Sequence, residues 1–575
     1  MADPAGTAPT PRPPPLSISD RIPHRRLGAS ALFAAYAEGD PRALAYVAHD
    51  PWRPEARAEA ARRAAGAPAD REGLADALLD QNAAWWGPEA EAVRGGIARL
   101  RDPESVAVVT GQQLGLFGGP LYTVYKALTA VRLARQFEDE TGRPAVPVFW
   151  LADEDHDFAE VHATTLLDPS PGAGAARSAS VRAAYVDGVP PDANRGPVGR
   201  LTLGPSVVEA LDAVEAALPP TPAAAALLEG LRADWAPGTR WRDAFARTLR
   251  RLTAGVGLVF ASADDARLKR LVTPLIRQEV ERWPDTLAVL EDVSGRLRAD
   301  GFHAQVASRP VNLFLFHEGQ RLPLDPEAGG FRLRGTGERL SADDLLALLD
   351  EAPERFSPGV VLRPLMQDRL FPTAAYVGGP GEVAYFAQLK PVYDLFGVPM
   401  PVVYPRASLT LVPEKVDRIL DRYGLALDDL TRAGEGQEET LAALHRRLAL
   451  ERSEVDLGAR FAAAAAALDQ LLGDLTPAAT GVDTSLDRAV AAAQAKARKA
   501  LDALETKTVR AAKRNEAVIL ARLQRAAAVL FPGGSPQERV VSPLTVLTTE
   551  GLDLPLRLLA TLSLDTREHQ VLPIA

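Results

Sequence analysis

Apolar positions between residues 31 and 101 recur with helical spacing and are rich in alanine. Proline and glycine interrupt this pattern near Pro51, Pro68 and Pro88, and Asp102-Pro103 stops it. The pattern predicts a group of helices separated by short breaks, because proline can neither donate the helical hydrogen bond nor fit a helix interior.

Short, continuous apolar runs follow that stop. Residues 105–110 (SVAVVT) lead into a glycine-rich segment, residues 121–140 return to helical spacing, and residues 145–152 (AVPVFWLA) form a second apolar run. A strand, a glycine-rich turn, a helix and a strand in this order are typical of a parallel α/β unit. Further strands are expected at residues 257–262, 311–317, 360–362, 374–377 and 398–403.

The same pattern predicts where the chain divides. Residues 1–22 are rich in proline and are expected to form a disordered tail, whereas residues 23–435 are expected to form an α/β core with an N-terminal helical region. Two stretches of the core look like insertions. Residues 168–240 are rich in Pro, Gly, Ala and Ser, and residues 318–350 alternate polar and glycine positions in a way that predicts hairpins.

A helical pattern returns in residues 436–530. Six apolar positions follow one another at spacings of four and three residues: Leu486, Val490, Ala493, Ala497, Ala500 and Leu504. This heptad seam predicts two long helices that form an antiparallel coiled-coil hairpin, joined by a turn that contains Pro477. A helical bundle packed on the core is the alternative interpretation. Residues 531–575 are expected to pack back on the core.

Composition limits the classes of function. The chain has 575 residues, with 65 Lys and Arg against 75 Asp and Glu, and its net charge is −10. This charge gives no general attraction to nucleic acid or to an anionic membrane, so neither is expected as a partner. Residues 484–525 differ, with ten Lys and Arg against four Asp and Glu. That stretch is either a solvated helix face or a surface that attracts a phosphate ligand or the acidic remainder of the chain.

The chain contains no cysteine, which excludes disulfides, thiolate metal sites and a cysteine nucleophile. No run of 18 uncharged apolar residues predicts a membrane span. The N-terminus lacks the basic and apolar regions of a secretory signal. The expected location is therefore the cytoplasm.

Residues 110–126 (TGQQLGLFGGPLYTVYK) join the first expected strand to the helix after it. Glycines let backbone N–H groups approach a ligand closely, and a helix N-terminus favours anions. The candidate binding residues are Gly111, Gln112, Gln113, Gly118, Gly119 and Tyr122. Thr123 and Lys126 are candidate catalytic residues, and Lys126 is placed to reach a phosphate. The segment fits neither GxxxxGK[ST] nor GxGxxG, so a tight turn without a ligand is the alternative.

Residues 150–158 (WLADEDHDF) place an acidic cluster at the carboxyl end of the 145–152 strand. Ligands of open α/β sheets bind outside such strand ends. The cluster consists of Asp155 and His156, which are candidate catalytic residues, and of Asp153, Glu154 and Asp157, which are candidate binding residues. It is suited to Mg²⁺, to a substrate ammonium or to general base catalysis. The alternative is an exposed turn that caps the next helix. The spacing of His156 and His162 does not bring them together, so no tightly bound metal is expected.

Two later segments add weaker candidates. RPLMQD (363–368) and the GGPG turn (378–381) offer a close-approach loop. YPRASLTLV (404–412) offers a guanidinium and two hydroxyls that could clamp a phosphate. The residues concerned are Gln367, Asp368, Gly378, Gly379, Arg406 and Ser408. A hairpin turn and an ordinary surface are the alternatives.

Four segments in combination resemble the bacillithiol biosynthesis cysteine-adding enzyme (BshC) family. They are TGQQLGLFGGPLYTVYKA, FWLADEDHDFAEV, RPLMQDRLFPTAAYVGGPGE and YPRASLTLVPEKV, in the order of the family, between residue 110 and residue 416. The resemblance implies a Rossmann-like core with two insertions, similar to nucleotidylyl transferases and class I aminoacyl-tRNA synthetases. It also implies a coiled-coil arm that makes a homodimer.

The resemblance further implies a ligase that joins L-cysteine to the amine of glucosaminyl malate, the last step of bacillithiol biosynthesis. ATP with Mg²⁺ is expected, because the cysteine carboxylate must be activated as an acyl-adenylate or an acyl-phosphate. Lys126 and the glycine-loop N–H groups would then stabilise charge on phosphate oxygens. The acidic cluster would bind the substrate ammonium or Mg²⁺. His156 is the candidate base, and its replacement by alanine would cut turnover roughly 10²–10⁴-fold.

The sequence departs from a synthetase-like core in two motifs. Residues 123–126 (TVYK) stand where a HIGH motif would fall, and the 404–416 segment has no KMSKS. A catalytically degenerate nucleotide-binding assembly protein that acts through its coiled-coil arm is therefore an alternative function. A metal-dependent hydrolase that uses the acidic cluster is a third, but further ligands at a readable spacing are missing.

Overall fold

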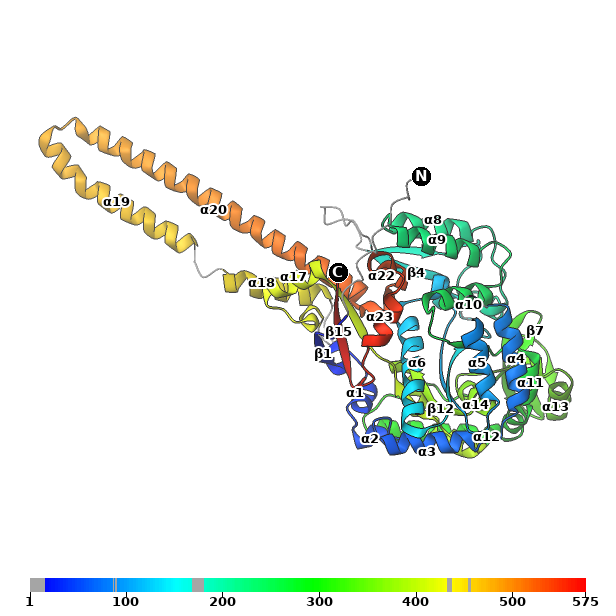
Figure 1. Cartoon of the computed structure of the whole chain (residues 1–575). Helices are drawn as coiled ribbons and strands as arrows, with labels where there is room; N and C mark the ends of the chain where they lie inside the picture. The colour runs from blue at the N-terminus through cyan, green and yellow to red at the C-terminus, as the bar shows by residue number, and fades with distance from the viewer. Residues whose placement is uncertain (1–15, 86, 88–89, 168–179, 432–436, 453–456) are drawn as a thin grey trace, which may run out of the picture. The chain divides into compact units, whose positions relative to one another are not determined.

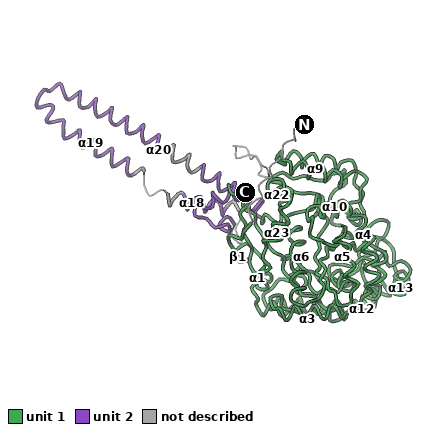
Figure 2. The backbone as a smooth tube through the Cα atoms, in the orientation of Figure 1, with its two compact units in different colours: residues 1–414, 535–575 green, residues 415–534 purple. Residues whose placement is uncertain are grey.

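The computed structural model describes residues 16–85, 87, 90–167, 180–431, 437–452 and 457–575. These residues form two compact units (Figure 2). One consists of residues 1–414 and 535–575, and the other of residues 415–534. Among the described residues, no helix combines the length and the apolarity that crossing a membrane requires.

The strands and helices follow one another along the chain as Figure 1 labels them. The strands are β1 (Asp20–Pro23), β2 (Val106–Gln112), β3 (Ala145–Leu151), β4 (Ala163–Leu167), β5 (Ser180–Ala184), β6 (Val259–Ser262), β7 (Leu313–His317), β8 (Gln320–Glu327), β9 (Gly330–Leu333), β10 (Arg339–Leu340), β11 (Phe356–Pro358), β12 (Thr373–Gly378), β13 (Val402–Pro405), β14 (Leu409–Pro413) and β15 (Glu568–Ile574). The helices of the first half are α1 (Ala31–Ala37), α2 (Pro41–Leu44), α3 (Pro54–Ala65), α4 (Arg71–Ala83), α5 (Ala90–Leu100), α6 (Leu121–Thr141), α7 (Phe158–Val161), α8 (Val207–Ala217), α9 (Pro222–Asp234), α10 (Trp241–Leu252), α11 (Ala266–Leu271) and α12 (Thr273–Ala299). Those of the second half are α13 (Ala342–Glu351), α14 (Leu362–Leu370), α15 (Pro380–Phe386), α16 (Lys390–Phe396), α17 (Glu414–Tyr423), α18 (Gln437–Arg452), α19 (Leu457–Val482), α20 (Leu486–Leu530), α21 (Gln537–Val540), α22 (Pro543–Glu550) and α23 (Leu554–Thr561).

A five-stranded parallel sheet forms the centre of the larger unit, in the order β13-β12-β2-β3-β6. Its strands are the continuous apolar runs of the sequence, because helices cover both faces and leave no polar side. The prediction of a parallel α/β sheet is confirmed. The expected strand at 360–362 is wrong, since Leu362 begins α14 and the strand nearby is β11.

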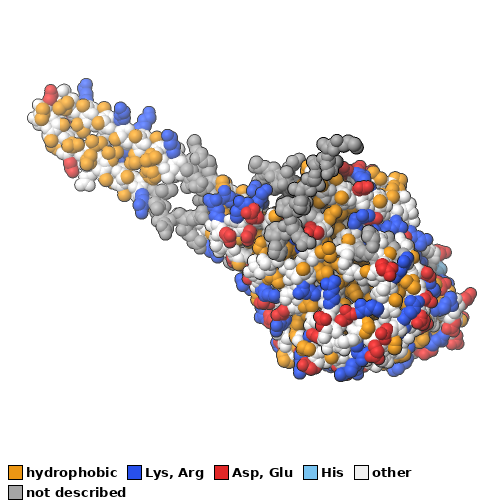
Figure 3. Space-filling view, viewed as in Figure 1, with side chains coloured by type: hydrophobic (Ala, Val, Ile, Leu, Met, Phe, Trp, Pro, Cys, Tyr) orange, Lys and Arg blue, Asp and Glu red, His pale blue; other side chains and the backbone are white. Residues whose placement is uncertain are grey.

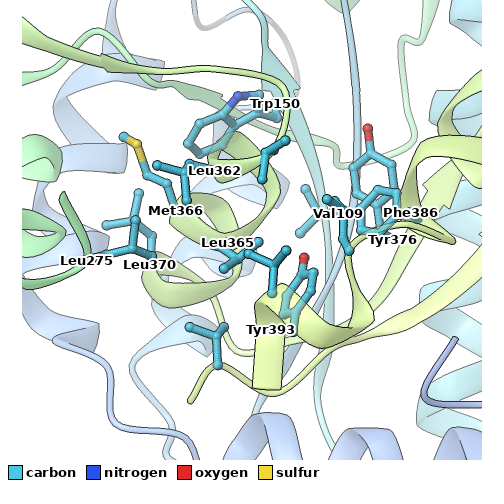
Figure 4. Close-up of a cluster of buried hydrophobic side chains, with 14 of the residues drawn as sticks. Val109, Trp150, Leu275, Leu362, Leu365, Met366, Leu370, Tyr376, Phe386 and Tyr393 are labelled. Atoms are coloured by element: carbon cyan, nitrogen blue, oxygen red, sulfur yellow. The ribbon is translucent and has the colours of Figure 1, made fainter. Parts of the chain in front are cut away.

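Side chains of the central strands alternate between two hydrophobic clusters. In β3, Val148 and Trp150 belong to one cluster, whereas Phe149 and Leu151 belong to the other. Figure 4 shows Trp150 of β3 beside Leu362 and Met366 of α14, and all three side chains are buried. The helix and the sheet therefore share a core, and the carboxyl ends of the strands are held in fixed positions.

A second, three-stranded sheet joins both ends of the chain in the order β1-β15-β14. β1 pairs antiparallel with β15, and β15 pairs parallel with β14. The tail expected at residues 1–22 is therefore too long, because Asp20–Pro23 is a paired strand; residues 1–15 lie outside the described residues. The pairing of β1 with a strand near residue 570 has no local signal in the sequence.

Both expected insertions contain regular structure. Strands β7 to β10 form successive antiparallel hairpins that extend to β11, so the hairpins expected at 318–350 are confirmed. In the 168–240 stretch, β5 pairs antiparallel with β4, and the helices α8 and α9 follow. Residues 168–179 of this stretch lie outside the described residues.

The smaller unit contains the long helical hairpin of α19 and α20 (Figure 1). Its turn lies at residues 483–485 rather than at Pro477, which is inside α19. Both Pro477 and Gly473, the residue four positions before it, are exposed, so water can solvate the carbonyl that loses its helical partner. Gln494 and Arg498 of α20 hydrogen-bond to Asp469 of α19 across the hairpin, at 3.0 and 2.7 Å.

The predicted heptad seam is only partly the surface that closes the hairpin. Val490 and Ala497 are half-buried, but Ala493, Ala500 and Leu504 are exposed. The half-buried positions run through Val490, Gln494, Ala497 and Leu501, so the seam is rotated relative to the prediction. Figure 3 shows apolar side chains along the outer surface of this hairpin.

Candidate active site

A cavity of about 780 Å³ lies at the carboxyl edge of the central sheet. Residues that end or follow each of its five strands line this cavity: Gln112 and Gln113 of β2, residues 152–155 after β3, Ala263 after β6, Gly379 after β12 and Arg406 after β13. Such an edge is where open α/β sheets bind ligands, and the volume is typical of small-molecule sites. We call this cavity the central pocket.

The glycine-rich segment forms one wall of the central pocket. A Cβ on Gly111 would lie 2.8 Å from the Trp150 carbonyl oxygen, so only glycine lets β2 and β3 approach here. The Gln112 amide donates to the Tyr122 hydroxyl at 3.0 Å, and the Gln113 amide donates to Asp155. Both glutamine side chains are thus held by neighbours that also line the pocket.

Lys126 also lines the pocket, but its ammonium is bound by other groups of the protein. It donates to the Gly111 carbonyl at 2.5 Å and to Gln112 Oε1 at 3.0 Å, and it forms an ion pair with Glu382 Oε2 at 2.5 Å. An ammonium has three hydrogens to donate. These contacts use all of them, so Lys126 does not offer the free charge to a phosphate that the sequence predicted. It fixes the positions of Gln112 and Glu382 instead.

Asp155 is the most accessible carboxylate of the acidic cluster in the pocket wall, with one third of its side chain exposed. Burial alone would raise its pKa, but hydrogen bonds from His156 and Gln113 and the charge of Arg321 hold the pKa well below its usual value. Asp155 therefore stays ionised across the neutral range and offers a fixed negative charge to a ligand.

Glu154 forms a buried ion pair with Lys269, a residue that the sequence did not single out. Lys269 is fully buried and donates to Glu154 Oε1 and, at 2.7 Å, to the Phe356 carbonyl oxygen. Because both charges are out of water, each depends on the other for compensation. This pair links the acidic cluster to α11 and β11.

Asp153 is fully buried, and its Oδ2 accepts a hydrogen bond from the Ser262 hydroxyl. Arg242 lies 3.7 Å from the same oxygen, while Oδ1 has no partner among the described residues. Burial and the nearby Asp264 raise the pKa of Asp153 to about 7. This carboxyl can therefore exchange a proton near neutral pH, unlike Asp155.

Arg321 comes from the second insertion and lies next to His156 and Asp155 of the acidic cluster. It donates to the Ser357 hydroxyl at 2.9 Å and to the Pro358 carbonyl at 2.7 Å, and its guanidinium lies 3.8 Å from the centre of the Phe314 ring. Its remaining nitrogen lies 3.2 Å from His156 Nδ1 and 3.7 Å from Asp155. No group of three or more His, Asp or Glu side chains in the described structure is arranged to hold a metal ion.

Two family models together match almost the whole chain. The N-terminal Rossmann-like domain of bacillithiol biosynthesis BshC matches residues 19–407, and the C-terminal coiled-coil domain of the same family matches residues 409–574. The chain belongs to the BshC family.

Curated relatives agree with this membership. A protein of Salinibacter ruber named "Putative cysteine ligase BshC" is 44% identical over 557 residues, which cover 96% of this chain and 98% of the relative. Proteins of the same name from Chlorobaculum tepidum and Solibacter usitatus are 36% and 34% identical, over 84% and 88% of this chain and 85% and 90% of their own lengths. The four segments that carried the resemblance thus lie in a chain that matches the family almost end to end.

Part of the glycine-rich segment faces away from the central pocket. Phe117, Gly118 and Gly119 all have positive φ angles, of 54°, 96° and 72°. A Cβ on Gly118 would lie 2.7 Å from a methyl group of Leu252, so this glycine is needed for packing against α10. Thr123 is fully buried, and its hydroxyl has no partner among the described residues. None of Gly118, Gly119 and Thr123 lines the pocket, in contrast to the prediction.

His156 and Asp157 also stand outside the pocket lining, although the sequence grouped them with Glu154 and Asp155. His156 lies beside Asp155, with Nδ1 3.2 Å from Arg321 and 3.4 Å from that carboxylate. Asp157 caps α7, since its side chain accepts from the Glu160 N–H at 3.2 Å. For Asp157 the capping alternative is therefore correct.

Of the candidate residues after position 360, some line the central pocket and others do not. Gln367 and Asp368 are buried in α14, where Asp368 accepts from Gln367 at 2.9 Å and from the Tyr393 hydroxyl at 2.5 Å. They are core polar groups and not pocket residues. Gly379 lines the pocket, whereas the Gly378 carbonyl accepts from the Arg406 N–H at 2.8 Å and continues the sheet.

Arg406 and Ser408 bind a carboxylate of the protein itself, so they do not form the open phosphate site that the sequence predicted. Both Arg406 terminal nitrogens donate to Glu538 at 2.8 Å, and the Ser408 hydroxyl donates to the same carboxylate at 2.7 Å. The Ser408 and Thr410 hydroxyls also contact the two ring nitrogens of His569, at 2.7 and 2.8 Å. Arg406 reaches the pocket lining, but Ser408 does not.

Acid is expected to weaken this network. Burial lowers the pKa of His569 from 6.5 to about 4, so between these values the unfolded chain binds more protons than the folded protein. Folding stability should therefore fall as the pH drops from 6.5 towards 4. The His569→Gln variant, which removes this titration, should show a smaller loss of melting temperature over that range by circular dichroism. Equal losses in the two proteins would contradict this assignment.

Proposed function

We propose that this protein is an ATP-dependent ligase that joins L-cysteine to the amine of glucosaminyl malate, the final step of bacillithiol biosynthesis. The observation that carries the proposal is the convergence of all four signature segments on one pocket. They contribute Gln112 and Gln113, Asp155, Gly379 and Arg406 to its lining. Membership of the BshC family supports the same reaction.

The pocket suits ATP and Mg²⁺ in size and in donor chemistry. Its volume of about 780 Å³ is enough for a nucleotide beside a small substrate. Mg²⁺ takes carboxylate oxygens and waters, and the ionised Asp155 offers a suitable oxygen. Bound ATP would supply activation of the cysteine carboxylate, which does not condense with an amine unaided in water.

The roles of the protein side chains follow from their contacts. Asp155, ionised and partly exposed, would hold an ammonium group or Mg²⁺, and the Gln113 amide keeps it in place. Asp153 lines the pocket with a pKa of about 7, but its side chain is fully buried, so a role as base would require a proton path from the attacking amine to this carboxyl. Lys126 would act as a positioning residue for Gln112 and Glu382.

The reaction can be tested with the purified full chain. Protein mixed with glucosaminyl malate, L-cysteine and Mg-ATP should form bacillithiol, detected by mass spectrometry, and the release of AMP or ADP would distinguish an adenylate from a phosphate intermediate. No product and no nucleotide turnover, in a sample that binds the substrates, would contradict the ligase. That outcome would favour the alternative, an assembly protein with a degenerate core.

We also propose that the helical hairpin makes a homodimer. Closure of the hairpin leaves Leu471, Leu475 and Leu504 with 59%, 51% and 55% of their surface exposed. A second copy that covers these side chains would remove apolar surface from water with two-fold symmetry. Light scattering at micromolar concentration should give twice the chain mass of 61.4 kDa, and Leu475→Glu with Leu504→Glu should reduce it. A wild-type mass near 61.4 kDa would contradict the dimer.

A further inference from the structure

Six cationic side chains line the central pocket, and four of them are bound by other groups of the protein. Lys126 and Arg406 form ion pairs with carboxylates, Arg321 contacts a hydroxyl and a carbonyl, and Arg363 donates to the Tyr385 hydroxyl. The other two are Arg309 and Arg539. Neither guanidinium has a hydrogen bond or an ion pair within the described part of the chain.

Hydrogen bonds made by the neighbouring residues fix the backbone that carries Arg539. Arg539 lies in the short helix α21, and the two residues before it are buried. The side-chain amide of Gln537 pairs with the backbone of Leu411 as a neighbouring strand would. It accepts from the Leu411 N–H at 3.0 Å and donates to the Leu411 carbonyl at 2.9 Å. The Glu538 carboxylate accepts from Arg406, Ser408 and the Leu409 N–H.

The residue two positions after Arg539 is fixed as well, since the Val541 carbonyl accepts from the Leu121 N–H at 2.8 Å. Arg539 itself is exposed and lines the pocket together with Tyr122 and Arg406. Arg309 is exposed as well, and side chains hold the backbone three residues to either side of it, at Val306 and Asn312. The held residues lie closer to Arg539, within one or two positions, so its backbone is the more narrowly fixed of the two.

The acidic groups of the pocket do not neutralise Arg539. Asp155 is bound by Gln113 and faces Arg321, Glu154 is paired with Lys269, and Glu382 is paired with Lys126. Glu160 also lines the pocket, but it makes no ion pair with Arg539. A guanidinium in this situation has its planar set of donors available for a carboxylate or a phosphate.

We propose that Arg539 binds an anionic oxygen group of the ligand in the central pocket. The inference rests on the proposed function, which supplies two sources of such a group: the carboxylates of glucosaminyl malate and the phosphates of ATP. The fixed backbone on both sides of Arg539 lowers the entropy that ligand binding must remove. The C-terminal segment thus contributes a specificity residue to a pocket that otherwise consists of core residues.

The test is calorimetric titration of the full chain with ATP-Mg²⁺ and, separately, with glucosaminyl malate. Arg539→Gln is expected to raise the Kd of one of the two ligands about tenfold or more and to reduce the dependence of that Kd on salt concentration. Arg539→Lys should recover part of the affinity. The matched control is Arg232→Gln, which removes another exposed guanidinium, one that pairs with Asp212 and Glu215 on the surface.

The two ligands separate the possible sources of the anion. Weaker binding of ATP alone identifies phosphate, and weaker binding of glucosaminyl malate alone identifies carboxylate; either result supports the proposal. Unchanged Kd values for both ligands in Arg539→Gln would overturn it and leave the proposed function standing. A wild-type protein that binds neither ligand would overturn both.

Discussion

Replacing Lys269 by methionine is expected to lower the free energy of unfolding by about 3–5 kcal/mol, because the buried Glu154 carboxylate then loses its only ion-pair partner in the described structure. The Lys269 ammonium is fully buried, so water cannot compensate for its loss. Chemical denaturation followed by circular dichroism measures the change. The double variant Lys269→Met with Glu154→Gln should regain part of the stability, since no unpaired charge remains.

The matched control is Arg277→Met. Arg277 forms a single ion pair with Asp350, in which 35% and 63% of the two side chains are exposed. Exposed pairs contribute at most about 1 kcal/mol, so this variant should remain close to the wild type. If Lys269→Met costs no more than Arg277→Met, the buried pair with Glu154 does not stabilise the folded protein in the way described.

Asp155→Asn is expected to reduce ligase turnover on the order of 10²-fold, more than the neighbouring substitution His156→Ala. Asparagine keeps the size of the side chain and can still accept from Gln113, but it removes the negative charge that faces the pocket. His156→Ala is expected to cost less than about tenfold, because His156 lies outside the pocket lining. The comparison measures kcat with all three substrates at saturation.

The opposite order would return His156 to the role of general base. A large loss in His156→Ala with near-normal turnover in Asp155→Asn would show that the imidazole, and not the pocket carboxylate, carries the chemistry. Unfolding curves of both variants serve as the control, since neither change should alter stability as much as Lys269→Met does.

The sequence predicted most of the central sheet because each of its strands is buried on both faces. Runs such as AVPVFWLA therefore stand out from the helical pattern, and β2, β3, β6, β12 and β13 all fall within or next to expected strands. The outer sheet was missed. Its strands pair residues near 20, 410 and 570, and the residue pattern of any one of them does not reveal its partners.

The candidate site was predicted in position but only partly in detail. Gln112, Gln113, Asp153, Glu154 and Asp155 line the pocket because they follow strands, and strand ends are visible in the sequence. The sequence did not reveal the ion-pair partner of each charged side chain. Lys126 meets Glu382, and Glu154 meets Lys269, over separations of more than 100 residues that no local motif encodes. Arg321, Lys269 and Arg539 carry no such signal either.

The heptad seam illustrates a further limit. Alanine and leucine at spacings of four and three predict a contact surface, but they do not tell which partner covers it. In the structure, α19 covers a rotated seam that includes Gln494, and it leaves Ala493, Ala500 and Leu504 exposed. Gln494 and Arg498 also hydrogen-bond to Asp469 across the hairpin, and a purely apolar pattern omits such contacts.

The central claim is that glucosaminyl malate and ATP bind at the carboxyl ends of the five parallel strands. A crystal structure of the full chain grown with glucosaminyl malate and Mg-ATP tests it most directly. The account predicts ligand density in the central pocket, in contact with Gln113 and Asp155 and with a negatively charged group at Arg539. Density for both ligands only on residues 415–534, with the central pocket filled by water, would contradict it.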